Sequence, residues 1–452
     1  MMPMANSHSA STTFTRRALL GTALAAGAAS LPGLPLRAQA AARDRQERLN
    51  ASRPLTIRQV EAMVIRNPPT PIAFDEPLDL PPVGDLTGGV GLWNRLDHAS
   101  PTRFKGYEQA VLVKITTDEG LVGWGECHAP SSPRVHQRVI TDLFAPVLRG
   151  KDARRINGLW ERLFTTERVR GYSTGSQFEA LAGVDLALWD LLGKALGLPV
   201  YQLLGGLYRP SQPLYRGVGG ATVDAIVADA KAAVSTGMQM VKMSYRKGKG
   251  SEDIERVAAV AAFMKPHGQV AVDSLGAFKL YEAVQAGRRF DALGNVGWFE
   301  DALQPDDQPA YPILAESLET PICAGEMLNN RFQFRDLLAT RGADIVNPDV
   351  CRAGGITECQ RIAGLADAFN VTWSPHVSTG TVLYFAASLH LALATPNCII
   401  MEGGRKLEGP LGNVLVRTPI RVENGGAFAP EGPGFGIEWN QAALARVTVK
   451  DA

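Results

Sequence analysis

The chain has 452 residues, of which 45% are hydrophobic and 20% are charged, so it contains enough apolar material for a large folded core. The formal net charge is only +1, which excludes the strong basic bias of a nucleic-acid-binding protein. Its five cysteines form no Cys-x-x-Cys motif, which excludes a disulfide framework and favours buried free thiols.

The first forty residues contain arginine but no aspartate, glutamate or lysine. Arg16 and Arg17 precede a weakly apolar run over 18–31, and the Ala-Gln-Ala at 38–40 has the pattern of a cleavage site. The run is too short to cross a bilayer. These features predict a twin-arginine signal over 1–40, a periplasmic protein, and no membrane association after cleavage; the alternative is a disordered tail.

The next part of the sequence mixes strand and helix patterns. A charged tail is predicted over 41–54. Alternating apolar residues then predict one strand, and a β-meander follows over 109–126. Between these strands, residues 67–106 are rich in Pro, Gly and Asp, which is typical of a long functional loop. Helical periodicity over 134–205 completes a predicted α+β domain over 55–206.

From residue 207 onward, short apolar runs alternate with amphipathic helical stretches. The eight runs end near Gly217, Lys242, Asp273, Glu300, Glu326, Asp349, His376 and Glu402. From Lys242 onward these ends are 23 to 31 residues apart, which is one strand-plus-helix unit. Eight such units predict an α/β fold with a parallel (β/α)₈-type barrel over 207–415, followed by a C-terminal segment over 416–452.

Ionisable residues stand at most of these predicted strand ends, which in a parallel barrel form the face that carries the chemistry. Asp273, Glu300 and Glu326 end three consecutive strands, about 4.8 Å apart, so their carboxylates would repel one another without a cation between them. Three carboxylates suit a hard dication, and Mg²⁺ most naturally. Ordinary capping of strand ends would instead give mixed Ser, Asn and Gly.

The seven ionisable residues at the predicted strand ends, from Lys242 to Glu402, form a ring at the mouth of the barrel. Its members other than the three carboxylates suit proton transfer. Asp349 and His376 end the next two strands, and a carboxylate beside an imidazole fixes its tautomer and raises its basicity. Lys242 faces them across the barrel, and Glu402 closes the ring. A dication with nearby cationic groups would stabilise the enolate formed when the proton α to a carboxylate leaves. The sequence therefore predicts metal-assisted proton abstraction α to a carboxylate.

These residues occur in motifs that, taken together, are highly specific. They are Val-Lys242-x-Ser244, Val-Asp273, Phe-Glu300-Asp-Ala, Ala-Gly-Glu326, Asn-Pro-Asp349, Ser-Pro-His376, Met-Glu402-Gly and the helical segment 181–206. Through them, the chain over about residues 55–440 resembles the enolase superfamily, in its mandelate racemase/muconate lactonizing enzyme branch.

The resemblance implies a modified TIM barrel, (β/α)₇β, with an α+β capping domain to which residues 416–452 return. It implies one essential Mg²⁺ per active site, which Mn²⁺ could replace, and a small-molecule carboxylate substrate. Asp349 and His376 match the dyad of the mandelate racemase subgroup, and Glu402 matches the position that binds the substrate carboxylate. Family members commonly assemble into dimers or octamers, so a homo-oligomer is expected.

The chain departs from the subgroup pattern in three places. The second strand of the pattern ends in Lys-x-Lys, where the second lysine is the base opposite the histidine; here Lys242 matches the first position and Ser244 occupies the second. Ser274-Leu275 follow Asp273, where some sugar-acid dehydratases carry a histidine. Asp301-Ala302 replace the commoner Glu-Pro or Gln-Pro. None of these changes removes a metal ligand.

Because a serine cannot remove an α-proton unaided, the resemblance favours a one-base reaction in which His376 abstracts the proton and a β-hydroxyl leaves. The first hypothesis is therefore dehydration of an acid sugar, an aldonate or aldarate, to a 2-keto-3-deoxy acid. The second is a racemase or epimerase of a hydroxy acid or other carboxylate, with Lys242 as the second base. The third is a catalytically silent carboxylate-binding protein.

Residues outside the ring are candidates for contact with the rest of the substrate. His98 and Arg103 lie in the predicted loop 67–106, which in this family covers the mouth of the barrel. His128 lies where the capping domain often meets the barrel, and Arg246 follows Ser244. Solvated loop positions are the alternative for each of these side chains.

Overall fold

The structure is a computed structural model that describes the following parts of the chain: residues 54–67, 108–130, 132–245, 250–403 and 405–450. The chain divides into a short N-terminal unit and a large unit that begins at residue 52, and all the elements below belong to the large unit. The predicted signal and most of the predicted long loop lie outside the described residues. Within the described residues, no helix has the length and apolar character needed to cross a membrane.

The first elements of the large unit form a small antiparallel sheet covered by helices. The sheet has the order β1-β2-β3, with β1 at Ile57–Asn67, β2 at Glu108–Thr117 and β3 at Val122–Cys127. Its helical part comprises α3 (Pro133–Arg138), the π-helical η2 (Val139–Phe144), α4 (Ala145–Leu148), α5 (Ile156–Thr165), the 3₁₀ turn η3 (Arg168–Arg170), α6 (Ser176–Leu196) and α7 (Val200–Leu203). This is the α+β arrangement that the periodicity predicts.

Helix α6 is packed unusually close to β3 because glycines line the contact. A Cβ at Gly125 would lie 1.9 Å from the carbonyl oxygen of Gly183, and a Cβ at Gly183 would lie 2.4 Å from the Cys127 sulfur. No side chain fits into either space. The long helix, buried along most of its length, therefore forms the centre of the capping region.

Eight parallel strands of the described residues form the barrel. They are β4 (Gln212–Gly217), β5 (Met240–Ser244), β6 (Gln269–Asp273), β7 (Val296–Glu300), β8 (Ile322–Ala324), β9 (Ile345–Val346), β10 (Thr372–Trp373) and β11 (Met401–Gly403). Strands β4 to β10 pair in chain order. Strand β11 pairs with β4, and a bridge between Trp373 and Cys398 connects β10 to the approach of β11, so the strands close into a ring.

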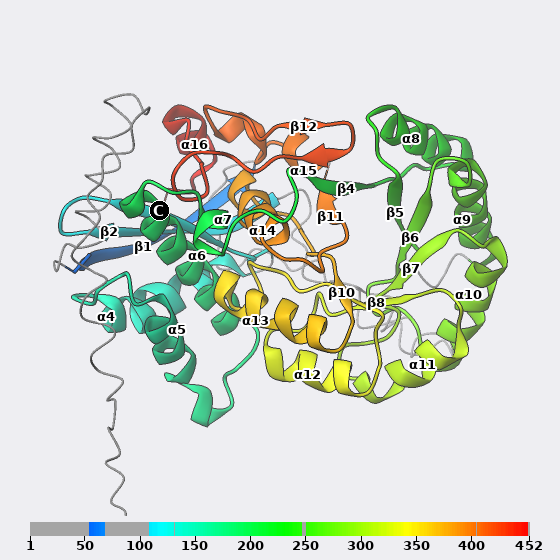
Figure 1. Cartoon of the computed structure of the whole chain (residues 1–452), viewed down its shortest axis with the longest axis horizontal. Helices are drawn as coiled ribbons and strands as arrows, with labels where there is room; N and C mark the ends of the chain where they lie inside the picture. Colours follow the sequence, from blue (N-terminus) through cyan, green and yellow to red (C-terminus); the bar gives the residue numbers. More distant parts are fainter. Residues whose placement is uncertain (1–53, 68–107, 131, 246–249, 404, 451–452) are drawn as a thin grey trace, which may run out of the picture. The chain divides into compact units, whose positions relative to one another are not determined.

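Helices surround this ring, as Figure 1 shows for α8 to α12 on the outer side of the strands. Between successive strands lie α8 (Val223–Ser235), α9 (Gly250–Met264), α10 (Leu280–Leu293), η4 (Gln308–Ala310) with α11 (Tyr311–Ser317), α12 (Arg331–Ala339), α13 (Gly355–Ala368) and α14 (Val382–Leu393). Seven strand-plus-helix units and a final strand give a (β/α)₇β barrel, which confirms the predicted fold class.

The chain beyond the last strand contacts both parts of the fold. Its elements are α15 (Arg405–Glu408), η5 (Asn413–Leu415), β12 (Val422–Glu423), β13 (Gly426–Ala427) and α16 (Gln441–Val447). Strand β13 pairs antiparallel with β4 of the barrel, whereas Thr448, just after α16, forms a bridge with Ile65 of β1. The C-terminal segment therefore connects the barrel to the capping sheet.

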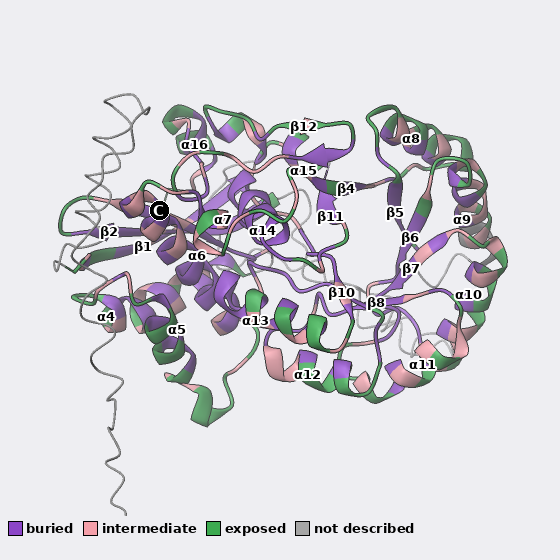
Figure 2. Ribbon diagram, viewed as in Figure 1, coloured by how far each residue is buried: buried purple, intermediate pink, exposed green. Residues whose placement is uncertain are grey.

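The buried residues form layers that place the polar ring at the mouth of the barrel. One apolar cluster fills the barrel interior: Tyr215, Met240, Ala271, Trp298, Cys323 and Ile345. Three of these residues stand two positions before a ring member on the same strand, so the ring lies one layer above the cluster. Figure 2 shows most of the barrel strands buried, with the exposed residues of the surrounding helices on part of their surface. All five cysteines are buried and free, as the sequence favours.

Candidate active site

Three carboxylates converge at the ends of neighbouring strands. Asp273 is the last residue of β6 and pairs in register with Glu300, the last residue of β7, while Glu326 follows β8 by two residues. Each side chain is buried, and each offers one oxygen within 4.8 Å of the others. Burial raises the pKa of Glu300 to about 7, although the neighbouring Lys242 lowers it. A cluster of buried carboxylates is costly unless positive charge compensates it.

Lys242 supplies part of that positive charge. Its Nζ lies 2.9 Å from Glu300 Oε1, 3.4 Å from Asp273 Oδ2 and 3.5 Å from Glu402 Oε2. Burial lowers the pKa of this lysine, but Glu300 and Glu402 outweigh burial and raise the pKa well above its ordinary value. Lys242 therefore stands among the carboxylates as a cation.

Ser244 lies two residues further along β5 and pairs in register with Asp273. Strand alternation puts its side chain on the same interior face as Lys242, one layer closer to the mouth. Lys242 is buried and Ser244 is exposed. The position that carries a lysine in the subgroup pattern thus presents only a hydroxyl.

On the other side of the cluster, His376 and Asp349 form a closely bonded pair. The His376 Nδ1 lies 2.7 Å from Asp349 Oδ2, and its Nε2 lies 3.2 Å from Glu326 Oε2. Burial lowers the pKa of His376, but Glu326 and Asp349 outweigh burial and raise it to about 9. The Asp349 side chain binds the imidazole through one nitrogen and leaves the other facing the acidic cluster.

Glu402 lies between these two sides of the ring. Its Oε2 accepts a hydrogen bond from the Val377 backbone N–H at 3.2 Å, and its Oε1 lies 3.9 Å from Lys406 Nζ on α15. Burial raises the pKa of Glu402, but Lys242 and Lys406 outweigh burial and lower it to about 2. The carboxylate is ionised and connects Lys242 to the histidine side of the ring, since His376 Nε2 is 4.0 Å away.

Comparisons with known proteins agree with this geometry. Residues 98–205 match the family described as "Mandelate racemase / muconate lactonizing enzyme, N-terminal domain", and residues 225–443 match "Enolase C-terminal domain-like". A D-galactonate dehydratase of Verminephrobacter eiseniae is 34% identical over 348 residues, which cover 74% of this chain and 90% of that enzyme. The chain belongs to the mandelate racemase/muconate lactonizing enzyme branch of the enolase superfamily.

Other relatives in this superfamily have different names. A D-galactarolactone cycloisomerase of Agrobacterium fabrum is 33% identical over 355 residues, which cover 75% of this chain and 92% of that one. The crystal structure of a 3,6-anhydro-D-galactonate cycloisomerase from Zobellia galactanivorans superimposes with a TM-score of 0.73 at 29% identity, covering 87% of this chain and 100% of that chain. These relatives are enzymes, and so is this protein.

Members of the superfamily bind a divalent metal, and Asp273, Glu300 and Glu326 are suited to hold one. The three donors are carboxylate oxygens, the ligand type that hard dications prefer. Within the described residues, the buried Glu326 Oε2 accepts no hydrogen bond and contacts only the ion-pair partner His376 Nε2 at 3.2 Å, so it has room for a bond to a cation. The donor set therefore fits a divalent cation.

Some residues that support the site were not singled out by the sequence. The Trp298 indole N–H donates to Glu300 Oε2 at 2.8 Å, and the Asn347 side-chain amide donates to Glu300 Oε1 at 3.3 Å. Both hold a candidate metal ligand in place, which is how residues around a metal site orient its ligands. The alternation along β7 was the one available signal, because it puts Trp298 directly beneath Glu300.

Of the four residues predicted to contact the rest of the substrate, the structure describes only His128. His98, Arg103 and Arg246 lie outside the described residues. His128 is buried, and its Nδ1 lies 3.7 Å from Glu179 Oε1, which is too long for a hydrogen bond. Neither of its ring nitrogens has a hydrogen-bond partner among the described residues. The predicted role of His128 in substrate binding stays a prediction.

Proposed function

We propose that the protein is a Mg²⁺-dependent lyase that removes water from an acid sugar, an aldonate or aldarate, and forms a 2-keto-3-deoxy acid. The observation that carries the proposal is the asymmetry of the ring. His376, paired with Asp349 at 2.7 Å, is an imidazole facing the acidic cluster, whereas Ser244 gives the opposite face a hydroxyl. One base is enough for elimination, and racemisation needs two. Relatives named D-galactonate dehydratase support the same reaction.

The first step is removal of the proton on the carbon next to the substrate carboxylate. The pKa of His376 is raised to about 9 because Glu326 and Asp349 outweigh burial, and a dication that took up the charge of Glu326 would lower that pKa. The neutral Nε2 would then take this proton while Asp349 holds Nδ1–H and stabilises the resulting imidazolium. The electron pair of the broken C–H bond forms the double bond of an enolate. The bond between the β-carbon and its hydroxyl then breaks, and the hydroxyl leaves as water with the proton that His376 returns. The enol product becomes the 2-keto-3-deoxy acid by tautomerisation.

Charged groups around the cluster lower the barrier to the first step. When bound by Asp273, Glu300 and Glu326, a Mg²⁺ ion would supply positive charge beside the substrate carboxylate and so make its α-proton more acidic. The Lys242 ammonium lies beside the same acidic cluster, 2.9 Å from Glu300 Oε1, and can bind the substrate carboxylate directly. Such fixed charges stabilise the transition state without the reorganisation that water would need.

A cycloisomerase is the second candidate, because two relatives carry that name. If the leaving oxygen belongs to a ring of the substrate, the same proton abstraction opens the ring and releases no water. The product then has the formula of the substrate. The residues proposed above would act in the same way, and the substrate alone would decide between the two outcomes.

The test is a screen of the purified enzyme with Mg²⁺ against acid sugars and their cyclic forms. Keto product is measured with semicarbazide, the mass change of the product by mass spectrometry, and exchange of the α-proton in D₂O by NMR. The variants are His376→Asn and, as a control, His267→Asn, which changes an exposed histidine outside the ring.

We expect keto product with a loss of one water, and His376→Asn to lower its rate by about 10²-fold to 10⁴-fold, the usual contribution of a general base. His267→Asn should keep the wild-type rate. A keto product of unchanged mass would assign the cycloisomerase reaction. Exchange of the α-proton with inversion and no keto product would overturn the elimination and indicate a racemase with Lys242 as the second base.

Two further parts of the proposal concern the protein in its cell. We propose export to the periplasm by the twin-arginine route, on the sequence of residues 1–40, which lie outside the described residues. We also propose a homo-oligomer, on the resemblance to the family. Size-exclusion chromatography with light scattering and fractionation of cells that express the full chain would test these two points.

A further inference from the structure

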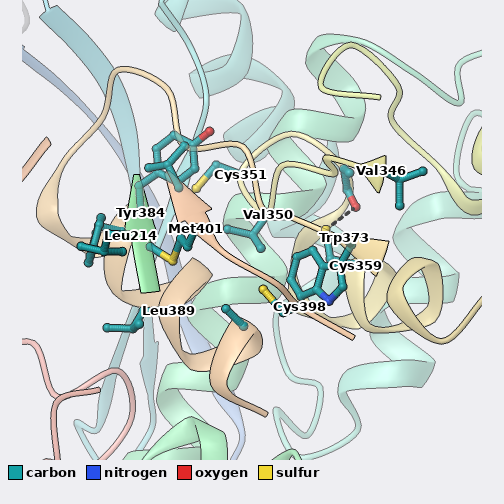
Figure 3. Packing of buried hydrophobic residues seen from close by; sticks show 14 of the residues in the cluster. Leu214, Val346, Val350, Cys351, Cys359, Trp373, Tyr384, Leu389, Cys398 and Met401 are labelled. Carbon is teal, nitrogen blue, oxygen red and sulfur yellow. Dashed lines mark hydrogen bonds between the residues drawn. The ribbon is translucent and has the colours of Figure 1, made fainter. Parts of the chain in front are cut away.

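The carboxylate of Asp349 is held from three sides. Its Oδ2 accepts both His376 Nδ1–H and the hydroxyl of Tyr384, and its Oδ1 accepts the Cys351 backbone N–H at 2.8 Å. Asp349 and Tyr384 are both completely buried. Tyr384 lies in the same apolar cluster as Cys351 (Figure 3). A buried tyrosine needs a partner for its hydroxyl, and here the partner is the oxygen that orients the base.

Tyr384 is in turn positioned by the capping region. It lies in the first turn of α14, whose N-cap is Thr381. Glu126, near the end of β3, accepts the Thr381 backbone N–H at 2.7 Å and the Thr381 hydroxyl at 2.5 Å. A Cβ at Gly380 would lie 2.4 Å from Glu126 Oε1, so the chain must pass close to this carboxyl group. The start of α14 is therefore fixed to β3.

Two donors on one carboxylate oxygen restrict how the carboxylate can rotate. If Asp349 lost the Tyr384 donor, its carboxylate could turn about the remaining bonds, and the imidazole plane of His376 would turn with it. Nε2 now faces the acidic cluster, 3.2 Å from Glu326 Oε2. Small errors in the position of a reacting group are costly, since a displacement of about 1 Å can lower a rate about 10²-fold.

We propose that Tyr384 is a positioning residue for the base. Its hydroxyl fixes the Asp349–His376 pair, and Glu126 of the capping region fixes Tyr384 through the N-terminus of α14. This inference rests on the proposed function for the identity of the base. A buried tyrosine that serves packing alone would lose stability on truncation of its hydroxyl but would leave the geometry of the base unchanged.

The test compares Tyr384→Phe with Tyr311→Phe. Tyr311 is also buried, and its hydroxyl donates to the Leu303 carbonyl at 3.0 Å, so its loss removes a comparable hydrogen bond away from the pair. For the acid sugar that the wild type converts, kcat, KM and the isotope effect of α-deuterated substrate are measured. We expect Tyr384→Phe to lower kcat by about 10-fold to 100-fold, to raise the isotope effect and to leave KM nearly unchanged.

A second measurement needs no substrate and separates this inference from the proposed function. The Nδ1–H proton of His376 donates to a carboxylate and should give a low-field signal in ¹⁵N-histidine NMR spectra, assigned by its absence in His376→Asn. We expect this signal to shift or broaden in Tyr384→Phe and to stay in place in Tyr311→Phe. If wild type converts no acid sugar, the proposed function fails while the signal still tests Tyr384.

A second pair of variants covers the case in which Tyr384→Phe does not fold. Thr381→Val removes the hydroxyl that Glu126 binds, whereas Thr381→Ser keeps it. Thr381→Val should lower kcat and broaden the His376 signal, and Thr381→Ser should behave as wild type. If Tyr384→Phe matches Tyr311→Phe in both kinetics and spectra, or if the two Thr381 variants do not differ, Tyr384 has a packing role alone and the proposal is wrong.

Discussion

Ser244 places a short hydroxyl on the interior face of β5, at the register position opposite Asp273. A lysine at this position would stand next to the acidic cluster, across the mouth from His376. Its chain is long enough to carry an amine towards a substrate held between the two sides. In the proposed mechanism, this single residue therefore separates a ring with one base from a ring with two.

This difference gives the first prediction, for the Ser244→Lys variant. With a second base, the α-proton can leave on one face and return on the other, so the variant should exchange the α-proton with inversion. We expect this exchange in D₂O to be at least about 10-fold faster than in wild type, because a placed general base contributes about 10²-fold to 10⁴-fold. Deuterium incorporation and optical rotation are followed by NMR and polarimetry.

Ser244→Met is the matched control, since methionine has a similar length but no amine. If it exchanges the proton as fast as Ser244→Lys, the effect comes from side-chain size. If Ser244→Lys gives no exchange, the side chain at this position does not reach the substrate.

The residues of the ring could be predicted from the sequence, and the residues that support it could not. Asp273 and Glu300 are the last residues of their strands, so a regular spacing of strand ends was enough to bring them together. Tyr384 lies in an apolar helix, and the contact between Glu126 and Thr381 joins residues 255 positions apart. Such contacts depend on how two domains pack, which no local pattern encodes.

At the scale of elements, the contact between α6 and α13 includes one buried carboxyl group. Asp185 of α6 accepts the Thr357 backbone N–H at 3.0 Å and the Thr357 hydroxyl at 2.6 Å, in the first turn of α13. A Cβ at Gly355 would lie 2.3 Å from Asp185 Oδ2, so only glycine fits there. Helix α13 follows Asp349 by a short loop, and its start is therefore fixed from the capping region.

The second prediction concerns the pH dependence of stability that Asp185 contributes. Burial raises its pKa from the ordinary value of 3.8 to about 7, although Thr357 lowers it. Between these values the folded protein binds a proton that the unfolded chain releases. The contribution of Asp185 to the free energy of unfolding is thus fully present below about pH 4 and is lost as the pH rises through about 7.

Urea unfolding of wild type and Asp185→Asn at pH values from about 4 to 8 measures this contribution, because other titrating groups cancel in the difference. We expect the free energy of unfolding of wild type to fall relative to the variant as pH rises, by at most about 1.4 kcal/mol per pH unit. Parallel curves for the two proteins would show that Asp185 keeps an ordinary pKa.

Element boundaries were harder to predict than element order. The eight strands occur where the apolar runs predict them, yet β9 and β10 have only two residues each and end three residues before Asp349 and His376. The chain continues past the ladder in irregular conformation to carry these two side chains. Apolar runs mark where a strand is buried but do not mark where its hydrogen bonds end.

At the scale of the whole molecule, the ring concentrates acidic side chains at the mouth of the barrel. It contains five carboxyl groups, those of Asp273, Glu300, Glu326, Asp349 and Glu402. Among the described residues, the basic side chains within ion-pair distance of these groups are Lys242, His376 and, at 3.9 Å, Lys406. Buried like charges repel in a medium of low dielectric constant. A bound dication removes this repulsion in the folded state, and the unfolded chain has no such site.

The third prediction is that chelation lowers the melting temperature. A ligand present at about 100 times its Kd stabilises the folded state by about 2.7 kcal/mol, so EDTA should lower the Tm by a few degrees, and added Mg²⁺ or Mn²⁺ should restore it. Differential scanning calorimetry measures the shift. In Glu326→Gln, which removes one oxygen donor, the Tm should respond weakly to the cation. An equal response in both proteins would place the stabilising ion elsewhere.

The bond between Glu126 and Thr381 has a consequence for protein engineering. Designers often treat a barrel as a reusable scaffold and exchange its capping region for that of a relative to change substrate specificity. In this protein the capping region, through Glu126 of β3, also carries the carboxyl group that binds Thr381 at the N-terminus of α14. A chimaera with a different residue at Glu126 or Thr381 would keep the side chains of its pocket but lose the hydrogen bonds that fix the start of α14. These two residues should therefore be transferred together.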